Sequence, residues 1–268
     1  MTLGRLRFAS CLAPSVRPMY EAVAAFVGER LGVETELVEC DDYERYFAAE
    51  EDDVHFVCSV PYVVSADRGD GTVEVLVAPV LAGDRYEGRP IYFSDVIVRR
   101  DSPFRRFEDL RGASWAYNEP LSHSGYWTTL YRLVTMGETA SFFGRVVDAG
   151  FHQVAIDMVR GGEIDASAVD SQVLEVAVRD DPGLAEDLRV VEALGPSTIQ
   201  PVTVARRLPR DVREAIREAL LAMHDDPAGR RALGLGLVER FTAADDASYD
   251  DIRRMRAACL SAGLTELG

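Results

Sequence analysis

The fold is decided by a stretch that alternates between strand and helix patterns, LRFASCLAPSVRPMYEAVAAFVGERLGVETELVE, residues 6–39. Its start, Leu6 to Cys11, is typical of a buried strand, and the run from Pro18 to Leu31 has apolar residues at helical spacing. Gly32 ends this predicted helix, and Glu34 to Glu39 alternates as a second strand. This order predicts an α/β sheet with mostly parallel strands, which binds ligands at the carboxyl ends of its strands.

The same alternation continues along most of the chain. We expect a helix at Tyr43–Ala49 and strands at His55–Val60, Ile91–Arg99 and Ser114–Tyr117. After Pro209 we expect mainly helix. The remaining expected elements are helices at 125–136, 154–160, 172–179, 211–223 and 249–262, and strands near 145 and at 166–169 and 201–205.

The length of the chain indicates two lobes. Its 268 residues lie at the size, about 250 to 300 residues, where a single hydrophobic core stops growing. Because the halves are not separated by a linker-like segment, we expect two strand crossovers near residues 95 and 202. Lobe I then comprises residues 1–95 and 203–268, lobe II comprises residues 96–202, and the lobes can move about the crossovers.

Charge and hydropathy exclude two classes of partner. The chain has 29 arginines and no lysine against 45 acidic residues, a formal net charge of −16. Nucleic-acid-binding proteins need a basic surface, so we do not expect nucleic acid as a partner. Since no apolar stretch approaches the roughly 20 residues that cross a bilayer, we do not expect a membrane-spanning protein. The acidic run Glu50 to Asp53 is interpreted as a solvated loop or helix end.

The cysteines and the first residues bear on metal sites and location. Cys11, Cys40, Cys58 and Cys259 lack paired spacing, so we expect buried thiols and no metal or cofactor. Met1 to Phe8 contains two arginines but no apolar segment of signal-peptide length, and no lipobox precedes Cys11. These residues favour a cytoplasmic location or a chain that has been trimmed.

The stretch with the most chemistry is Asn118-Glu-Pro-Leu-Ser-His-Ser-Gly-Tyr126, which follows a predicted strand and opens a predicted helix. Ser122, His123 and Ser124 lie at this helix start, where unpaired backbone N–H groups and the helix dipole favour an anion. Serine is also among the commonest N-caps. Both roles stay open, and one residue can serve in both.

A second polar group follows in the same half of the chain. His152 precedes a predicted helix, and Asp170 and Ser171 come directly after an apolar strand, at the edge where α/β sheets bind ligands. Each has a plain structural alternative, because His152 can be a cap or surface residue and Asp170 can simply cap the next helix.

Several tyrosines add aromatic surface with a polar tip. Tyr92 and Ser94 stand two apart on a predicted strand, so their side chains share a face. Tyr43, Tyr46 and Tyr62 fall in the first lobe. Most tyrosines in a chain of this composition belong to the core, and the residues alone do not separate core from site.

In order and spacing these motifs resemble the phosphate, phosphite and phosphonate solute-binding proteins of ATP-driven importers. The resemblance covers almost the whole chain. One position departs from the family pattern, because His123 stands where the Ser-Thr-Ser-Gly-Tyr helix start has threonine. The matching segments are Tyr92 to Ser94, Asp101 to Pro103, Phe107 to Gly112, Ser122 to Tyr126, Gly150 to His152 and Gly162 to Ser171.

The resemblance implies a type II periplasmic-binding-protein fold, α/β and two-lobed, in which each lobe is a mostly parallel sheet flanked by helices and the ligand cleft lies between the lobes. It implies capture of a small oxyanion without covalent chemistry, for an ABC permease or a sensor, by a monomer in the periplasm or at the cell surface. Asp170 would accept a ligand proton or ammonium group. The predicted ligand-binding residues are Ser122, His123, Ser124, Tyr92, His152, Asp170, Tyr43 and Tyr62.

Two alternatives remain open at this point. The first is a cytosolic enzyme on the same fold, of the menaquinone-pathway or thiamine-precursor type, in which His152 or His123 acts as general base with Asp170 as its partner. The second is the ligand-sensing domain of a regulator. An enzyme needs an acid and a base that converge on one reacting atom, whereas a binding protein needs donors around an anion.

Overall fold

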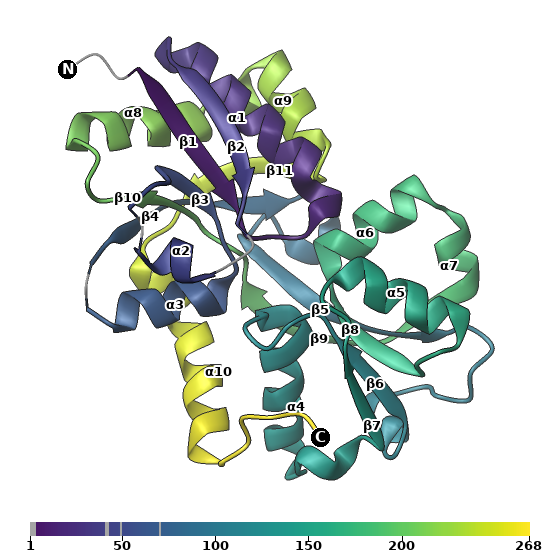
Figure 1. Ribbon diagram of the computed structural model, residues 1–268. Coiled ribbons are helices and arrows are strands. Elements are labelled where there is room, and N and C mark those ends of the chain that lie inside the picture. The colour runs from purple at the N-terminus through teal and green to yellow at the C-terminus, as the bar shows by residue number, and fades with distance from the viewer. Residues whose placement is uncertain (1–3, 41–42, 49, 70) are drawn as a thin grey trace. The chain divides into compact units, whose positions relative to one another are not determined.

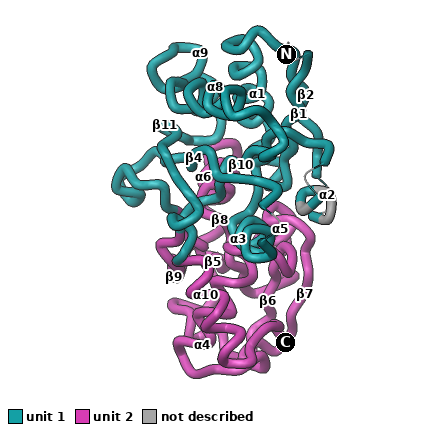
Figure 2. The backbone as a smooth tube through the Cα atoms, turned by 90° about the vertical axis from the view of Figure 1, so that its left-hand side faces the viewer, with its two compact units in different colours: residues 1–91, 198–250 teal, residues 92–197, 251–268 magenta. Residues whose placement is uncertain are grey.

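In the computed structural model, which describes residues 4–40, 43–48, 50–69 and 71–268, the chain divides into two compact units. Unit 1 comprises residues 1–91 and 198–250, and unit 2 comprises residues 92–197 and 251–268 (Figure 2). The chain therefore passes between the units three times. This division differs from the expected lobes, which had two crossovers and placed residues 251–268 in lobe I.

Unit 1 contains a sheet of six strands in the order β11-β4-β10-β3-β1-β2 (Figure 1). β1 is parallel to β2 and β3, whereas β10 is antiparallel to β3 and β4, and β11 is antiparallel to β4. Parallel pairing was expected for most of the sheet, but among its described residues it is found only between β3, β1 and β2. Parallel strands are usually joined by a helical crossover, whereas the chain runs into β10 directly from the last strand of unit 2. The strands are β1 (Arg5–Ser10), β2 (Glu34–Glu39), β3 (Val54–Phe56), β4 (Val73–Leu81), β10 (Val202–Ala205) and β11 (Val238–Ala243).

The helices of unit 1 include one that was predicted nearly to its ends. α1 (Arg17–Leu31) ends at Gly32, whose φ of 67° lies in the left-handed region that favours glycine. The apolar run His55–Val60 was predicted as a strand, but the strand stops at Phe56. A helix begins at Ser59, and Pro61 suits its first turn. The others are α2 (Tyr43–Ala48), α3 (Ser59–Asp67), α8 (Arg210–Leu221) and α9 (Pro227–Gly234).

Unit 2 contains a five-stranded sheet in the order β7-β6-β8-β5-β9. β6 is parallel to β7 and β8, and β5 is antiparallel to β8, with Ser94 opposite Asp170. β5 and β6 have the predicted bounds, whereas β9 and, in unit 1, β4 and β11 were not predicted. The strands are β5 (Ile91–Arg99), β6 (Ser114–Tyr117), β7 (Arg145–Asp148), β8 (Ala166–Asp170) and β9 (Leu188–Thr198).

The helices of unit 2 follow its strands. A π-helical turn, η4 (His123–Trp127), leads into α4 (Thr128–Met136) directly after β6. The later helices are α5 (His152–Gly161), α6 (Ser171–Asp180), α7 (Gly183–Asp187) and α10 (Asp250–Ser261). Among the described residues, no helix has the length and apolar character needed to cross a membrane.

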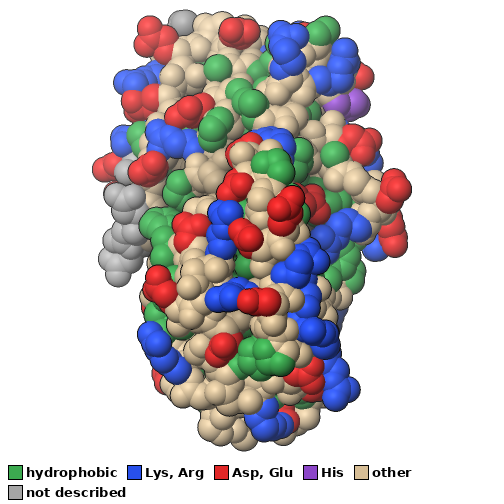
Figure 3. All heavy atoms as spheres, turned by 90° about the vertical axis from the view of Figure 1, so that its right-hand side faces the viewer, with side chains coloured by type: hydrophobic (Ala, Val, Ile, Leu, Met, Phe, Trp, Pro, Cys, Tyr) green, Lys and Arg blue, Asp and Glu red, His purple; other side chains and the backbone are tan. Residues whose placement is uncertain are grey.

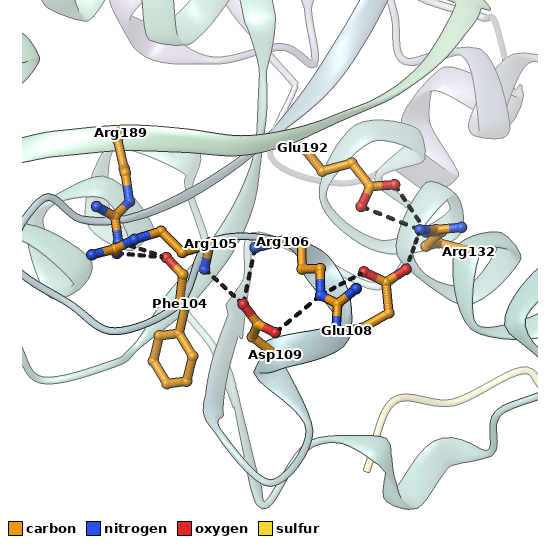
Figure 4. A network of polar contacts seen from close by, with 8 residues as sticks. All are labelled: Phe104, Arg105, Arg106, Glu108, Asp109, Arg132, Arg189 and Glu192. Carbon is orange, nitrogen blue, oxygen red and sulfur yellow. Dashed lines mark hydrogen bonds and ion pairs between the residues drawn. The ribbon is translucent and has the colours of Figure 1, made fainter.

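Two motifs of the family pattern shape the connection from β5 to β6. Asp109, in the turn η3 (Phe107–Leu110), accepts hydrogen bonds from the backbone N–H groups of Arg105 and Arg106, at 2.9 and 3.3 Å (Figure 4). Arg189 of β9 donates to the carbonyl oxygens of Ser102 and Phe104. These contacts hold residues 101–110 in shape, so this part of the family pattern has a structural role.

Charged side chains of both signs are interspersed on the face shown in Figure 3. The described residues form several exposed ion pairs, such as Arg160 with Asp181 at 2.7 Å and Arg132 with Glu108 at 2.8 Å. Exposed pairs of this kind contribute little to folding stability.

Half of the acidic run 50–53 is buried, which corrects its interpretation as a solvated segment. Glu50 and Glu51 are exposed, but Asp52 and Asp53 are buried where the chain enters β3. Asp53 accepts a hydrogen bond from the Arg7 backbone N–H at 2.8 Å and one from the Arg207 guanidinium at 2.7 Å. The carboxylate thus ties β3 to β1 and to the end of β10.

We expect Asp53→Ala to lower the free energy of unfolding by about 1–3 kcal/mol, because it leaves the Arg7 N–H without its acceptor. Urea unfolding monitored by circular dichroism measures the change. Glu50→Ala, in the exposed half of the run, is the matched control and should stay within about 0.5 kcal/mol of wild type. Equal stability of the two variants would show that Asp53 has no structural role.

The described residues contain no disulfide between the four cysteines. Cys58 and Cys259 are buried, as predicted. Cys11 and Cys40 are partly exposed, which differs from the prediction, because each comes directly after the end of a strand.

Candidate functional site

The start of η4 presents several backbone donors at one place. Ser122 is the N-cap, and its Oγ accepts a hydrogen bond from the Gly125 N–H at 3.0 Å. The first backbone bond of the turn runs from Trp127 N to Ser122 O, at 3.1 Å. Backbone N–H groups in the first turn of a helix generally have no acceptor within the helix, and they lie at its positive end. We call residues 122–126 the cradle. The N-cap interpretation of Ser122 is confirmed.

Ser124 and His152 are brought together at the cradle. Ser124 Oγ lies 3.1 Å from His152 Nε2, and both side chains are buried. Within the described part of the chain, His152 Nδ1 is buried without a hydrogen-bond partner. Burial lowers the pKa of His152 to about 4, so the ring is neutral near pH 7. A neutral imidazole has one donor and one acceptor nitrogen, so its Nε2 can hold the Ser124 hydroxyl in place by a hydrogen bond.

Gly125 allows Asn118 to approach the backbone of the cradle. A Cβ atom at position 125 would lie 1.9 Å from Asn118 Oδ1 and 3.2 Å from His152 Cε1. A side chain at position 125 would force Asn118 or the turn to shift, so glycine lets the two pack closely. Asn118 was not among the predicted site residues, although its place directly after β6 was a signal that could have identified it.

His123 has a different neighbourhood from Ser124. Its Nε2 lies 2.9 Å from Ser197 Oγ, and its ring centroid lies 6.2 Å from that of Tyr92. The side chain is fully buried, and burial lowers its pKa to about 3, so this ring is also neutral near pH 7.

Ser94 of β5 is linked to the cradle by hydrogen bonds through Thr128. Ser94 Oγ lies 2.9 Å from Thr128 Oγ1, which in turn lies 2.8 Å from the carbonyl oxygen of Ser124. Tyr92, two residues earlier on the same strand, is buried beside His123. Both residues were singled out from their spacing, and the structure places both near the cradle.

Asp170 caps α6. Its Oδ1 accepts hydrogen bonds from the N–H groups of Gln172 at 2.8 Å and Val173 at 3.3 Å, and Ser171 Oγ accepts one from the Phe93 N–H at 3.1 Å. The alternative that Asp170 caps the following helix is therefore confirmed. Its role toward a ligand stays a prediction.

The two predicted tyrosines of unit 1 are held by contacts inside that unit. The hydroxyl of Tyr43 donates to the carbonyl oxygen of Cys11 at 3.3 Å, and that of Tyr62 donates to Asp246 Oδ1 at 2.6 Å. Of the eight predicted site residues, the other six belong to unit 2. In unit 1 the sequence analysis also missed the start of α3 at Ser59, because the run His55–Val60 was expected to continue as a strand.

His123 and His152, the two buried histidines near the cradle, predict that the stability of the fold is acid-sensitive. The pKa of His152 falls from 6.5 to about 4 on folding, so the unfolded chain binds a proton first. The stability from this neutral burial is fully present above about pH 6.5 and is lost as the pH falls toward 4. We expect the titration of His152 to lower the free energy of unfolding by about 2 kcal/mol between pH 7 and pH 5.

Urea unfolding at a series of pH values measures this loss. His152→Phe, which keeps a buried ring but cannot titrate, should show a smaller loss of stability between pH 7 and pH 5 than wild type. The same change at the partly exposed His224 is the control. Parallel pH profiles for all three proteins would contradict the prediction.

Comparison with known proteins identifies the family. Residues 10–249 match the family described as ABC transporter, phosphonate, periplasmic substrate-binding protein. The chain belongs to this family. The matched range includes the whole cradle, His152 and Asp170. The resemblance inferred from the motifs is therefore confirmed, and so is the general function, which is substrate binding for an ABC transporter and not catalysis. The enzyme alternative has no support.

Individual relatives agree with the family. The phosphonates-binding periplasmic protein of Escherichia coli (strain K12) is 22% identical over 249 residues, which are 90% of this chain and 72% of that protein. A binding-protein component of a phosphonate ABC transporter from Pseudomonas aeruginosa has a TM-score of 0.83, with 17% identity, 96% of this chain and 87% of that chain covered. A methylphosphonate complex from Prochlorococcus marinus (MIT 9301) has a TM-score of 0.81, with 16% identity and 94% and 97% covered. The two structural likenesses confirm the type II fold.

Proposed function

We propose that this protein captures a small phosphorus oxyanion, of the phosphonate, phosphite or phosphate type, at the cradle of unit 2. The observation that carries the proposal is the start of η4, where the N-cap Ser122 and the buried Ser124 hydroxyl lie at the positive end of the helix. Such a helix start binds an anion through its N–H groups and its dipole. The methylphosphonate complex of the related Prochlorococcus protein supports this ligand class.

The neutral character of the cradle suits the charge of the chain. At a net charge of −16, an anion is better held by neutral donors in a buried place than by an exposed cluster of cations. His123 and His152 are buried and neutral, so neither adds a cation. A phosphonate presents three acceptor oxygens, and hydroxyl and N–H groups are complementary to them. The Asp170 carboxylate would accept a hydrogen bond from a protonated oxygen or an ammonium group of the ligand.

The remaining parts of the proposal concern the transport system. We propose that the protein acts as a monomer, in the periplasm or at the cell surface, and delivers its ligand to a permease of the ABC type. Tyr92 and, in unit 1, Tyr43 and Tyr62 would complete the ligand contacts. Ligand binding would close the units about their chain crossovers.

A thermal-shift screen tests the proposed ligand class. The panel contains phosphate, phosphite, methylphosphonate, aminoethylphosphonate, sulfate and small carboxylates. A ligand at about 100 times its Kd should stabilise the folded protein by about 2.7 kcal/mol, which raises the Tm visibly. A shift that is selective for phosphorus oxyanions is expected. A shift with carboxylates alone, or no shift with any anion, would overturn the proposal.

A further inference from the structure

The segment 251–268 belongs to unit 2, where it contacts the turn that forms the cradle. Figure 2 shows α10 and the end of the chain in the colour of unit 2. From three separate contacts we infer that residues 251–268, which we call the brace, hold η4 in the geometry that binds the anion. The inference rests on the proposed function, because it assigns how the proposed site keeps its shape.

The first contact joins Tyr126 to the backbone of the brace. The Tyr126 hydroxyl accepts a hydrogen bond from the Leu267 N–H at 3.2 Å and donates to the Thr265 carbonyl oxygen at 3.5 Å. Tyr126 is itself buried. One phenol group therefore uses both its donor and its acceptor on the brace, next to the donors of the cradle.

The chain reaches Tyr126 by turning back after α10. Gly263 has a φ of 68°, in the left-handed region, and the Leu264 N–H donates to the Cys259 carbonyl oxygen at 3.0 Å. The turn buries Leu264 and Leu267, which are 7% and 5% exposed. Figure 1 shows the chain returning from α10 toward α4. The end of the brace is therefore packed in place by apolar contacts and is not a loose tail.

The second contact joins Arg256 of α10 to Trp127. The guanidinium carbon lies 5.5 Å from the centroid of the indole ring, within the range of a cation–π interaction. The indole Nε1 also donates to the Pro120 carbonyl oxygen at 3.0 Å. Trp127 thus links α10 to the loop that precedes the cradle.

The third contact runs through His123. His123 Nε2 lies 2.9 Å from Ser197 Oγ, which lies 3.9 Å from the sulfur of Met255 in α10. The ring occupies the place of the threonine of the family pattern, and its greater length reaches Ser197. His123 was predicted as a ligand-binding residue, and these contacts assign it a positioning role instead.

The three contacts use three different side chains of η4. His123 contacts Ser197, and Tyr126 and Trp127 contact the brace. Ser124 and Gly125 contact Asn118 and His152. The brace therefore holds the cradle through side chains other than the Ser122 and Ser124 hydroxyls that are proposed to bind the ligand. Such preorganisation raises affinity because less order is lost on binding.

Two substitutions remove brace contacts without touching the donors of the cradle. Tyr126→Phe removes both hydrogen bonds to the brace, and Ser197→Ala removes the link from His123 to Met255. The matched control is Tyr131→Phe, the same change at a partly buried position on α4. Calorimetric titration with methylphosphonate and with phosphate gives the Kd. Hydrogen exchange of the unliganded protein gives the protection of the amides at 122–127.

We expect Tyr126→Phe and Ser197→Ala each to raise the Kd by about 2- to 30-fold. Exchange at 122–127 should become faster while exchange in β8 stays as in wild type. Tyr131→Phe should change neither quantity. Unchanged exchange in both brace variants would overturn the inference, and so would faster exchange with an unchanged Kd. Should Tyr126→Phe fail to fold, Ser197→Ala decides by the same criteria.

The proposed function fails in a different way. Wild-type protein that binds neither methylphosphonate nor phosphate would overturn the ligand assignment. The exchange data need no ligand and would still test the role of the brace. Faster exchange at 122–127 in the brace variants supports that role, and unchanged exchange rejects it.

Discussion

Gly125→Ala is expected to weaken oxyanion binding by more than about 100-fold, because a displaced cradle loses at least two donor bonds at about 1.5–3 kcal/mol each. The added methyl would lie 1.9 Å from Asn118 Oδ1. Either Asn118 or the turn has to move. If the turn moves, its N–H groups no longer converge on the ligand. Calorimetric titration with the anion selected by the thermal-shift screen measures the loss.

A second substitution tests whether the clash is the cause. Asn118→Ala removes the amide oxygen that the methyl would meet, so the double variant Asn118→Ala, Gly125→Ala should recover most of the lost affinity. Gly161→Ala is the control, since a Cβ there meets nothing nearer than Glu163 Oε1 at 3.9 Å. If Gly125→Ala binds as tightly as wild type, the turn has not been displaced and the predicted effect of the clash on binding is wrong.

Ser124→Ala is expected to weaken oxyanion binding by about 5- to 150-fold, the equivalent of about 1–3 kcal/mol for a buried partner left unpaired. Its hydroxyl lies 3.1 Å from His152 Nε2. In the proposed site the hydroxyl donates to the ligand and the imidazole holds it in place. The Kd of the same anion is the measurement.

A double-mutant cycle with His152→Phe separates the two contributions. If the imidazole acts through the hydroxyl, the double variant should bind no worse than the weaker of the two single variants. Strict additivity would show that Ser124 and His152 contact the ligand independently. Ser141→Ala, at the exposed residue of the turn η5 (Ala140–Phe142), is a control and should leave the Kd unchanged.

Local patterns were enough to predict most elements of the fold. α1 with its end at Gly32, β2 at residues 34–39 and β5 at residues 91–99 follow from apolar spacing and one glycine, because these signals are written in neighbouring residues. The strands β9 and β11 were not predicted from local patterns. Their residues are only partly buried and alternate weakly, so pairing with a distant strand decided their conformation.

The family pattern also indicated the position of the cradle, but it could not assign a role to each side chain. Asp170 caps α6, and the Asp109 motif holds a turn. A sequence signature records that a residue type recurs, and a carboxylate can recur because it caps a helix or because it binds a ligand. Hydrogen-bond partners separate the two cases.

The sequence by itself determined the family, the α/β class and the position of the helix start at which we propose that the anion binds. The tertiary structure alone decided that residues 251–268 join unit 2, that His123 contacts Ser197, and that Asp52 and Asp53 are buried. The physical reason is the distance along the chain. Strand, helix and cap preferences act between residues a few positions apart, whereas these contacts join residues separated by tens of positions or more. Which of them form is settled by the packing of the whole unit.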